Sequence, residues 1–492
     1  MEPRSIIFVT VDCLRADHTG FLGYNRPTTP FLDTLAKNGM TAKAVVAGAP
    51  TYYSFPALLA SRPPLALGRD IVGLAPGEVS LAAVLKQAGY STAAFSAANP
   101  YLSPRFGYDQ GFDFFRDFLD STPPPQLPSS TQSRRKVSVN SAVRRSFEAL
   151  GMTEIYNDLY FQYCQRVAIP PAKSLDALRR FPAADVIVDL ARSWLVSQQG
   201  PFFLWLHFMD PHSPYYPAPA ALVDMGDARM TPQRARYVNE SWNRSDISQR
   251  KLGQYRDEVV TLYDAGIRWV DRQLGRLVEM LRQTRRWDNC LFAFTADHGE
   301  EFLDHGGRYH APVKATEELI RVPLLLHGAG LPSFAANAPF ALLNLAPTLL
   351  EGVGLESPPE FYGRSQWQSL LHAGLPEEAV VIECVDGCTN PFYRKNRLGS
   401  RLLAICDARY KLVLRFGTGE EVLYDLQADP REQSPLERDV LPDVRGHLLR
   451  AAFEHLRRTN SIPSEGLRLA ACVRDLRLEL TSPHHANADH VA

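Results

Sequence analysis

The sequence predicts an α/β protein in which a mostly parallel central sheet is covered by helices on both faces and is followed by a smaller C-terminal α+β unit. The first reason is that short, almost wholly apolar runs alternate with amphipathic helical patterns up to about residue 365. The second reason is that shorter strands separated by turns replace this alternation afterwards. The 492 residues leave room for both units.

The first unit opens with a strand predicted over Ser5 to Val11, a run of mainly apolar residues that is typical of a strand buried on both faces. Phe31, Leu32 and Leu35 then recur at helical spacing. Gly39 ends the helix that they predict. Further strands are predicted over 91–96, 202–208, 290–294 and 322–326, and further helices over 54–60, 81–88, 258–284 and 340–350.

The second unit is expected to contain strands over 379–383, 410–416 and 421–424. Gly417 to Glu420 is a turn-forming stretch between two of them, so it predicts a hairpin.

The sequence therefore divides into three parts. Residues 1–365 form the expected catalytic domain, 366–458 the smaller unit and 459–492 a partly disordered extension with a His-rich tail. An insertion over 121–182 interrupts the first domain. It is expected to be mobile at its proline-rich start and helical over 143–163. It could serve as a lid or specificity element, or be a surface segment without a role in the site.

Composition excludes several functions. The net charge of −1 gives no electrostatic basis for binding nucleic acid or an anionic membrane. No apolar run is long enough to cross a bilayer, and the first residues lack the pattern of a signal peptide. Seven scattered cysteines do not suggest a disulfide framework. We therefore expect a cytoplasmic protein acting on a small molecule, with an oligomeric state that the sequence does not decide.

Ligand-type residues follow several of the predicted strands. Asp12 follows the first strand, Asp210 and His212 follow a second, and Asp297 and His298 follow a third. Thr51 lies in a turn, and His305, Arg308 and His310 lie in a segment just beyond the third strand. Because carboxyl ends of parallel strands meet at one edge of a sheet, these side chains are expected to converge. Each residue taken singly could instead be a helix cap, a turn or a surface residue.

The motifs around these residues resemble the alkaline phosphatase superfamily, specifically its sulfatase-like branch. The match extends over roughly residues 5–435, with the motifs in the expected order. The resemblance implies an alkaline-phosphatase-like α/β/α sandwich with a metal-dependent ester-cleaving site. The segments that carry it are Val9 to His18, Asn99 to Tyr108, Gly111 to Asp113, Asp210 to Tyr215, Tyr263 to Ile267, Thr295 to Glu300, Leu345 to Leu350 and Leu423 to Pro430.

The chain departs from the sulfatases at the nucleophile. Those enzymes convert a Cys or Ser to formylglycine, whereas Thr51 occupies that position here, and Tyr53 and Phe55 replace the Pro and Arg of the motif. A formylglycine hydrate releases sulfate by elimination from its second hydroxyl. A threonine sulfate has no second hydroxyl and lacks this route. Thr51 resembles the threonine nucleophiles of phosphodiesterases and phosphoethanolamine transferases of the superfamily. Ser54 is the alternative nucleophile, although we expect it to cap the following helix.

The resemblance implies that Asp12, Asp297 and His298 hold a divalent cation together with Thr51. This mixed oxygen and nitrogen set favours Zn²⁺ or Mn²⁺ over Ca²⁺ or Mg²⁺. One ion is expected and a second is possible. The residues that could hold the second ion or contact the substrate are Asp210, His212, His305, Arg308 and His310.

Two further roles are open at this point. His212 and His310 could bind the second ion, or could contact the ester oxygens directly with one as general acid. Arg15 could offset the charge of the ester oxygens together with Arg308. Arg15 could equally form a structural ion pair with Asp17.

Three functions are consistent with this pattern. The first is a hydrolase of phosphate or phosphonate monoesters or diesters that acts through Thr51, with sulfate esters less favoured. The second is a transferase that passes the same covalent intermediate to a non-water acceptor. The third is a catalytically inactive binding protein. Retention of Asp12, Thr51, Asp297 and His298 together argues against the third.

Overall fold

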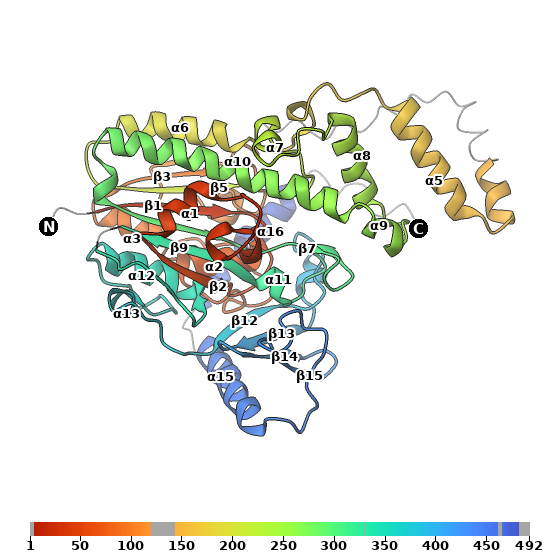
Figure 1. Cartoon of the computed structure of the whole chain (residues 1–492). Coiled ribbons are helices and arrows are strands. Elements are labelled where there is room, and N and C mark those ends of the chain that lie inside the picture. Colours follow the sequence, from red (N-terminus) through yellow and green to blue (C-terminus); the bar gives the residue numbers. More distant parts are fainter. Residues whose placement is uncertain (1–3, 120–142, 329, 461–464, 482–492) are drawn as a thin grey trace.

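The structure is a computed structural model that describes residues 4–119, 143–328, 330–460 and 465–481. Among these residues, a nine-stranded sheet lies between two layers of helices, and a four-stranded antiparallel sheet forms a second, smaller unit (Figure 1). The predicted fold class, with its mostly parallel central sheet and C-terminal α+β unit, is confirmed.

The central sheet positions the candidate site because its middle strands are parallel. Strand β1 pairs in parallel with β5 on one side and with β6 on the other, whereas β9 runs antiparallel to both of its neighbours. From one edge to the other the strands are β10 (Phe334–Ala335), β2 (Met40–Val45), β9 (Arg321–His327), β6 (Cys290–Ala296), β1 (Ser5–Val11), β5 (Phe202–Phe208), β3 (Ser91–Ser96) and β4 (Phe114–Arg116), with β11 (Phe340–Ala341) paired to β2.

The three middle strands are apolar because both of their faces are covered. Every residue of β1, β5 and β6 is buried. Burying one Leu or Phe side chain contributes about 1.5–3 kcal/mol, so these strands are a main source of stability. One face is covered by α1 (Pro30–Ala36), α6 (Ala184–Val196) and α10 (Arg256–Gln283), and the other by α2 (Thr51–Ala60), α3 (Leu81–Gln87) and α12 (Leu345–Gly352) (Figure 1).

The smaller unit consists of the second sheet and the helix packed on it. The predicted hairpin is formed by β14 (Tyr410–Arg415) and β15 (Glu420–Asp425), which pair antiparallel. Strand β12 (Val380–Val385) and the unpredicted β13 (Arg401–Cys406) complete the sheet, and α15 (Pro442–Asn460) packs on it (Figure 1).

Further elements connect and cover these layers. They are α5 (Thr153–Tyr163), α7 (Pro219–Asp224), α8 (Pro232–Asn243), α9 (Gln249–Gly253), the short hairpin β7 (Glu301–Phe302) and β8 (Arg308–Tyr309), α11 (Glu317–Ile320), α13 (Trp367–Leu371), α14 (Arg394–Arg397) and α16 (Glu465–Thr481). None of the helices within the described ranges is both long enough and apolar enough to span a membrane.

Some predicted elements differ from the structure. The helix predicted over 340–350 begins only at Leu345, because β11 occupies Phe340–Ala341. The helix predicted over 143–163 is interrupted at 150–152, around Gly151 in the left-handed conformation. The start of the predicted insertion, 121–142, and the predicted tail, 482–492, lie outside the described residues. Within the predicted extension, α16 packs Ala471 against Leu67 and Ile71.

Candidate active site

The centre of the site lies where β1 and β6 end side by side. Val11 is opposite Ala296 in the register of the two strands, so the residues that follow them, Asp12 and Asp297, leave the sheet at the same level. Thr51 is the first residue of α2. The side chains of Asp12, Thr51, Asp297 and His298 are all buried. The predicted convergence of these four residues is therefore present in the structure.

The four side chains are close enough to share one cation. Oγ1 of Thr51 lies 3.1 Å from Nε2 of His298 and 3.4 Å from Oδ2 of Asp12. One ligand atom from each of Asp12, Asp297 and His298 lies within 4.8 Å of the others. Oδ2 of Asp297 is buried and has no hydrogen-bond partner. A buried carboxylate oxygen without a partner is costly, and a bound cation would satisfy it.

His298 has the orientation of a metal-binding histidine. Its Nδ1 lies 2.8 Å from the carbonyl oxygen of Gly299. Because a carbonyl only accepts, Nδ1 carries the proton, and the lone pair of Nε2 faces Thr51 and Asp12. Burial, together with nearby His310, lowers the pKa of His298 to about 4, so its imidazole is neutral at neutral pH. A neutral imidazole is the form that binds metals.

The two carboxylates of the cluster have different environments. Burial and the neighbouring charge of Asp12 raise the pKa of Asp297 well above its usual range. Burial also raises the pKa of Asp12, but the imidazoles of His212, His207 and His298 outweigh that effect and hold it well below the usual range. Two adjacent buried carboxylates cannot both ionise cheaply without a cation between them.

Three residues outside the predicted set of site residues contact Asp12. Nδ2 of Asn99 donates to Oδ2 of Asp12 at 2.8 Å, and Nε2 of His207 lies 3.5 Å from the same oxygen. The thiol of Cys13 donates to Oδ1 at 2.9 Å. His207 lies inside the apolar strand β5, and Asn99 lies in the loop after β3. Neither residue follows a strand directly, so its position alone does not mark it as a site residue.

The segment around Thr51 differs from its prediction. Helix α2 begins at Thr51 and not at Ser54, and Oγ of Ser54 donates to the carbonyl oxygen of Thr51 instead of capping the helix. Phe55, at the position of the missing arginine, is fully buried and packs edge-on against His207 with ring centroids 5.2 Å apart. Tyr52 and Tyr53 are also buried, so their side chains belong to the core.

His212 and His310 are brought to the same site. The ring of His310 lies 4.6 Å from that of His298 and 5.3 Å from that of His212, measured between centroids. Nδ1 of His310 lies 3.3 Å from Oε1 of Glu300, a fully buried carboxylate that the sequence analysis did not select. Burial lowers the pKa of His310, but Glu300 outweighs it, so the net effect raises that pKa.

Two predicted residues are held away from the cluster by backbone groups. Oδ1 of Asp210 accepts from the backbone N–H of Ala184 at 3.2 Å, at the start of α6. Arg308 donates to the carbonyl oxygens of Trp242 and Arg244. Neither residue is brought to the metal cluster, because these backbone partners fix its side chain elsewhere.

Two more predicted residues are occupied by ion pairs. Nδ1 of His305 lies 2.8 Å from Oε1 of Glu318. Arg15 contacts both Asp17 and Asp304 at 2.8 Å, as in the structural alternative considered for it above. Its guanidinium is therefore already neutralised, and we do not assign Arg15 a direct contact with the substrate.

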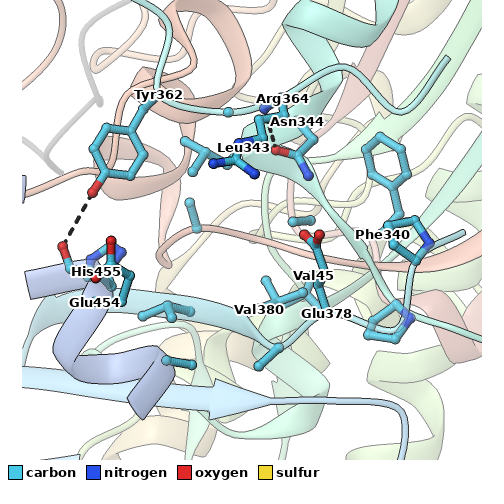
Figure 2. A pocket seen from close by; sticks show the side chains of 18 of the residues that line it. Val45, Phe340, Leu343, Asn344, Tyr362, Arg364, Glu378, Val380, Glu454 and His455 are labelled. Atoms are coloured by element: carbon cyan, nitrogen blue, oxygen red, sulfur yellow. Dashed lines mark hydrogen bonds between the residues drawn. The ribbon is translucent and has the colours of Figure 1, made fainter. Parts of the chain in front are cut away.

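A separate cavity of about 760 Å³ lies between the central sheet and the smaller unit. Figure 2 shows Tyr362, Asn344, Arg364 and Glu378 around it, with the hydroxyl of Tyr362 donating to the carbonyl oxygen of His455 at 3.3 Å. The residues of the metal cluster do not line this cavity. This cavity is therefore separate from the candidate cation site.

Comparison with known proteins supports the predicted resemblance. A family model described as Sulfatase matches residues 4–355. The chain is 24% identical over 497 residues to the multifunctional alkaline phosphatase superfamily protein PehA of Trinickia caryophylli, covering 89% of this chain and 92% of that protein. It is also 24% identical over 308 residues to a choline-sulfatase of Rhizobium meliloti, covering 59% of this chain and 54% of that protein.

A solved structure shows the same fold. The phosphonate monoester hydrolase of Silicibacter pomeroyi matches with a TM-score of 0.64 at 19% identity, and the match covers 94% of this chain and 96% of that chain. The sulfatase-like resemblance predicted from the motifs is confirmed.

Proposed function

The chain belongs to the sulfatase family, and from that premise we propose that it hydrolyses phosphate or phosphonate monoesters or diesters through Thr51 and a bound divalent cation. The observation that carries the proposal is the position of the Thr51 hydroxyl. Its Oγ1 lies 3.1 Å from Nε2 of His298 and 3.4 Å from a carboxylate oxygen of Asp12, inside the cluster of cation ligands.

The residues present fit a divalent cation. Asp12, Asp297, His298 and Thr51 would hold it, and the unpartnered Oδ2 of Asp297 supports this assignment. Three oxygen ligands and one nitrogen ligand favour Zn²⁺ or Mn²⁺. When bound, such an ion lowers the pKa of a coordinated hydroxyl and holds it for in-line attack. Thr51 also starts a helix, whose positive end favours a developing alkoxide.

His310 is the proposed proton donor to the leaving group. Glu300 raises its pKa against the effect of burial, which favours the imidazolium. The hydrogen bond between Nδ1 and Oε1 of Glu300, at 3.3 Å, orients the ring and leaves the other nitrogen to donate. Hydrolysis of the Thr51 ester would complete the cycle, with water attacking phosphorus and returning the hydroxyl to Thr51.

The chemistry of Thr51 favours phosphorus over sulfur. A threonine ester of phosphate or phosphonate can be cleaved by attack of water at phosphorus. A threonine sulfate lacks the second hydroxyl through which formylglycine enzymes expel sulfate. The absence of an arginine at Phe55 also separates this site from the formylglycine motif.

A sulfate ester is the second candidate substrate. The observation that favours it is that relatives of the chain include a protein named choline-sulfatase. Thr51 would then form a sulfate ester that must be cleaved by attack at sulfur. A direct comparison of sulfate and phosphate esters distinguishes the two candidates.

The test is a turnover panel with the Zn²⁺- and Mn²⁺-loaded protein. An aryl phosphate, a bis-aryl phosphate, an aryl phosphonate monoester and an aryl sulfate are compared at equal leaving-group pKa. We expect a phosphorus ester to be cleaved fastest. Thr51→Ala should lower kcat/KM for it by on the order of 10³-fold or more, equivalent to about 4 kcal/mol.

Thr51→Ser is the matched control, because it keeps a hydroxyl at the same position and should retain part of the activity. Circular dichroism and metal content check that each variant is folded and loaded. Wild-type activity in Thr51→Ala would contradict the nucleophile assignment. Fastest turnover of the aryl sulfate would favour the second candidate.

A further inference from the structure

The backbone that follows β1 is held from three sides. The N–H of Asp12 donates to the carbonyl oxygen of Phe208 at 2.8 Å, where β5 ends. The N–H of Cys13 donates to Oδ1 of Asp297 at 3.3 Å, just after β6. The carbonyl oxygen of Cys13 accepts from the hydroxyl of Tyr263 at 2.7 Å. Two of these contacts come from neighbouring strands, and the third comes from α10, which covers the sheet (Figure 1).

Tyr263 is a fully buried residue whose hydroxyl serves two backbone groups. It donates to the carbonyl oxygen of Cys13 and accepts from the N–H of Arg15 at 3.0 Å. One hydroxyl therefore satisfies a donor and an acceptor on either side of Leu14. The ring of Tyr263 packs edge-on against that of Phe302, with centroids 4.9 Å apart, and this packing fixes where the hydroxyl lies.

The turn that Tyr263 holds is conformationally unfavourable. Cys13 has a φ of 62°, in the left-handed region that residues with a side chain rarely adopt. Such a conformation persists only where the surroundings enforce it. If the carbonyl of Cys13 lost its donor, relaxation to an ordinary φ would rotate the peptide that joins Cys13 to Asp12. The same rotation would break the hydrogen bond from Cys13 to Asp297.

We propose that Tyr263 is a positioning residue, whose hydroxyl holds Cys13 in this conformation and thereby fixes the Asp12 carboxylate in the cation site. Oδ2 of that carboxylate lies 3.4 Å from Oγ1 of Thr51, and Oδ1 lies 3.6 Å from Nε2 of His298. The role of Asp12 as a cation ligand rests on the proposed function, whereas the hold of Tyr263 on Cys13 does not.

The next residue of α10 anchors the remainder of the same segment. Asp264 is fully buried, and its Oδ1 lies 2.7 Å from Nδ1 of His18. Its Oδ2 accepts from the hydroxyl of Tyr24 at 2.7 Å and from Nη1 of Arg26 at 2.6 Å. Residues 18–26 would keep this anchor without the hydroxyl of Tyr263. Tyr263→Phe is therefore expected to loosen residues 12–15 and to leave the rest of the segment in place.

The first test is the alkylation rate of each cysteine in the metal-free protein, followed by mass spectrometry of its peptides. In the wild type, fully buried Cys13 should react far more slowly than the partly exposed Cys164, because a covered thiol is reached only when its segment opens. In Tyr263→Phe, the rate at Cys13 should rise about tenfold. The rate at Cys290, also buried, should not change, which shows that global unfolding is unaffected.

Tyr90→Phe is the matched control for the loss of a hydroxyl. Tyr90 is buried directly before β3, at the strand end opposite the candidate site, and its hydroxyl has no hydrogen-bond partner among the described residues. This control should keep the wild-type rate at Cys13. An unchanged rate at Cys13 in Tyr263→Phe would overturn the proposal. So would a wild-type protein in which Cys13 reacts as fast as Cys164, a result that does not depend on any variant folding.

The second test is calorimetric titration with Zn²⁺. Loss of a residue that orients a metal ligand typically weakens metal binding about 10–100-fold, and we expect an effect of this size in Tyr263→Phe. Tyr90→Phe should bind Zn²⁺ as the wild type does. Faster alkylation of Cys13 with unchanged Zn²⁺ affinity would overturn the link between Tyr263 and Asp12.

This inference and the proposed function can fail separately. Wild-type Zn²⁺ affinity in Tyr263→Phe overturns the positioning role and leaves Thr51 and the cation site untouched. A wild-type protein that binds no Zn²⁺ contradicts the cation site and, with it, the effect of Tyr263 on a cation ligand. The alkylation rates then still decide whether Tyr263 holds Cys13.

Discussion

Phe55 explains how the site accommodates the loss of the arginine of the sulfatase motif. Its ring is fully buried and packs edge-on against His207, whose Nε2 lies 3.5 Å from Oδ2 of Asp12. The position of the arginine is therefore filled by an apolar side chain that packs against a histidine beside Asp12, a proposed metal ligand.

The four residues proposed to hold the cation were predicted because Asp12, Asp297 and His298 follow strands and Thr51 occupies the nucleophile position of the sulfatase-like motif. No site role was predicted for Asn99, His207 or Glu300, whose contacts depend on the packing of separate segments. Arg308 was predicted as a site residue only because it lies close to a motif in the sequence. In the structure its partners are the backbone carbonyl oxygens of Trp242 and Arg244, which are distant in the sequence.

His305 should stabilise the fold in a pH-dependent manner. Its hydrogen bond to Glu318, at 2.8 Å, raises its pKa above the usual value of about 6.5. A raised folded-state pKa gives a stabilisation that is complete below the unfolded-state pKa and is lost as pH rises through the folded-state value. The difference in free energy of unfolding between wild type and His305→Gln should therefore be larger at about pH 5.5 than at about pH 8.5.

Chemical denaturation at both pH values measures this difference. His372→Gln provides the control, because His372 is exposed and bonded only to a carbonyl in its own helical turn. An equal effect of His305→Gln at the two pH values would contradict the assigned ion pair.

The junction of β6 with α11 depends on a close backbone approach. The N–H of Gly299 donates to the carbonyl oxygen of Leu319 at 2.9 Å. A Cβ added to Gly299 would lie 1.9 Å from the carbonyl oxygen of Glu318. No side chain fits this space unless the backbone moves. Because Gly299 directly follows His298, any such movement would displace a proposed ligand of the cation.

Gly299→Ala should therefore lower both stability and metal affinity. We expect a loss of about 1–3 kcal/mol in the free energy of unfolding, typical of overpacking, and a measurably weaker first metal site. Thermal unfolding and calorimetric titration with Zn²⁺ provide the measurements. Gly200→Ala is the matched control, because an added Cβ there meets nothing within 4 Å. Unchanged metal affinity in Gly299→Ala would show that this contact does not position His298.

Elements were predicted correctly where burial makes the sequence apolar. They were predicted incorrectly where they depend on pairing between strands. The apolar runs of β1, β5 and β6 identify buried strands because all of their residues are covered. The direction of β9 could not be predicted, because the same apolar sequence is compatible with parallel and with antiparallel pairing. Strand β11 is only two residues long and depends on its partner β2, so its sequence resembled the helix that follows.

A buried ion-pair network joins the smaller unit to the catalytic domain. Lys411, on β14, is fully buried, and its Nζ lies 2.7 Å from Oε1 of Glu432 and 3.2 Å from Oε1 of Glu317. Glu317 begins α11, the helix whose backbone meets Gly299. The network therefore connects the second sheet to the segment that supports the end of β6.

Lys411→Met should destabilise the whole molecule, because it leaves the buried carboxylate of Glu432 without its cation and leaves Glu317 paired with Arg321 alone. Removing one partner of a buried ion pair costs about 3–5 kcal/mol, and denaturant unfolding measures this loss. Lys395→Met is the control, since Lys395 is exposed. A loss no larger than that of the control would contradict a structural role for the network.

The overall organisation was predictable because collinear motifs extend through both units. The contact between the units was not, because it depends on Lys411, Glu317 and Glu432, which are far apart in the sequence. A lysine in an amphipathic strand is expected at the surface, and only the assembled fold places it between two acids.

The claim that Thr51 carries the reaction is tested most directly by mass spectrometry of the enzyme quenched in acid during turnover of an aryl phosphonate monoester. We predict that the peptide containing Thr51 gains the mass of one phosphonyl group, and that Thr51→Ala gains none. Modification of another residue, together with wild-type turnover by Thr51→Ala, would contradict the account.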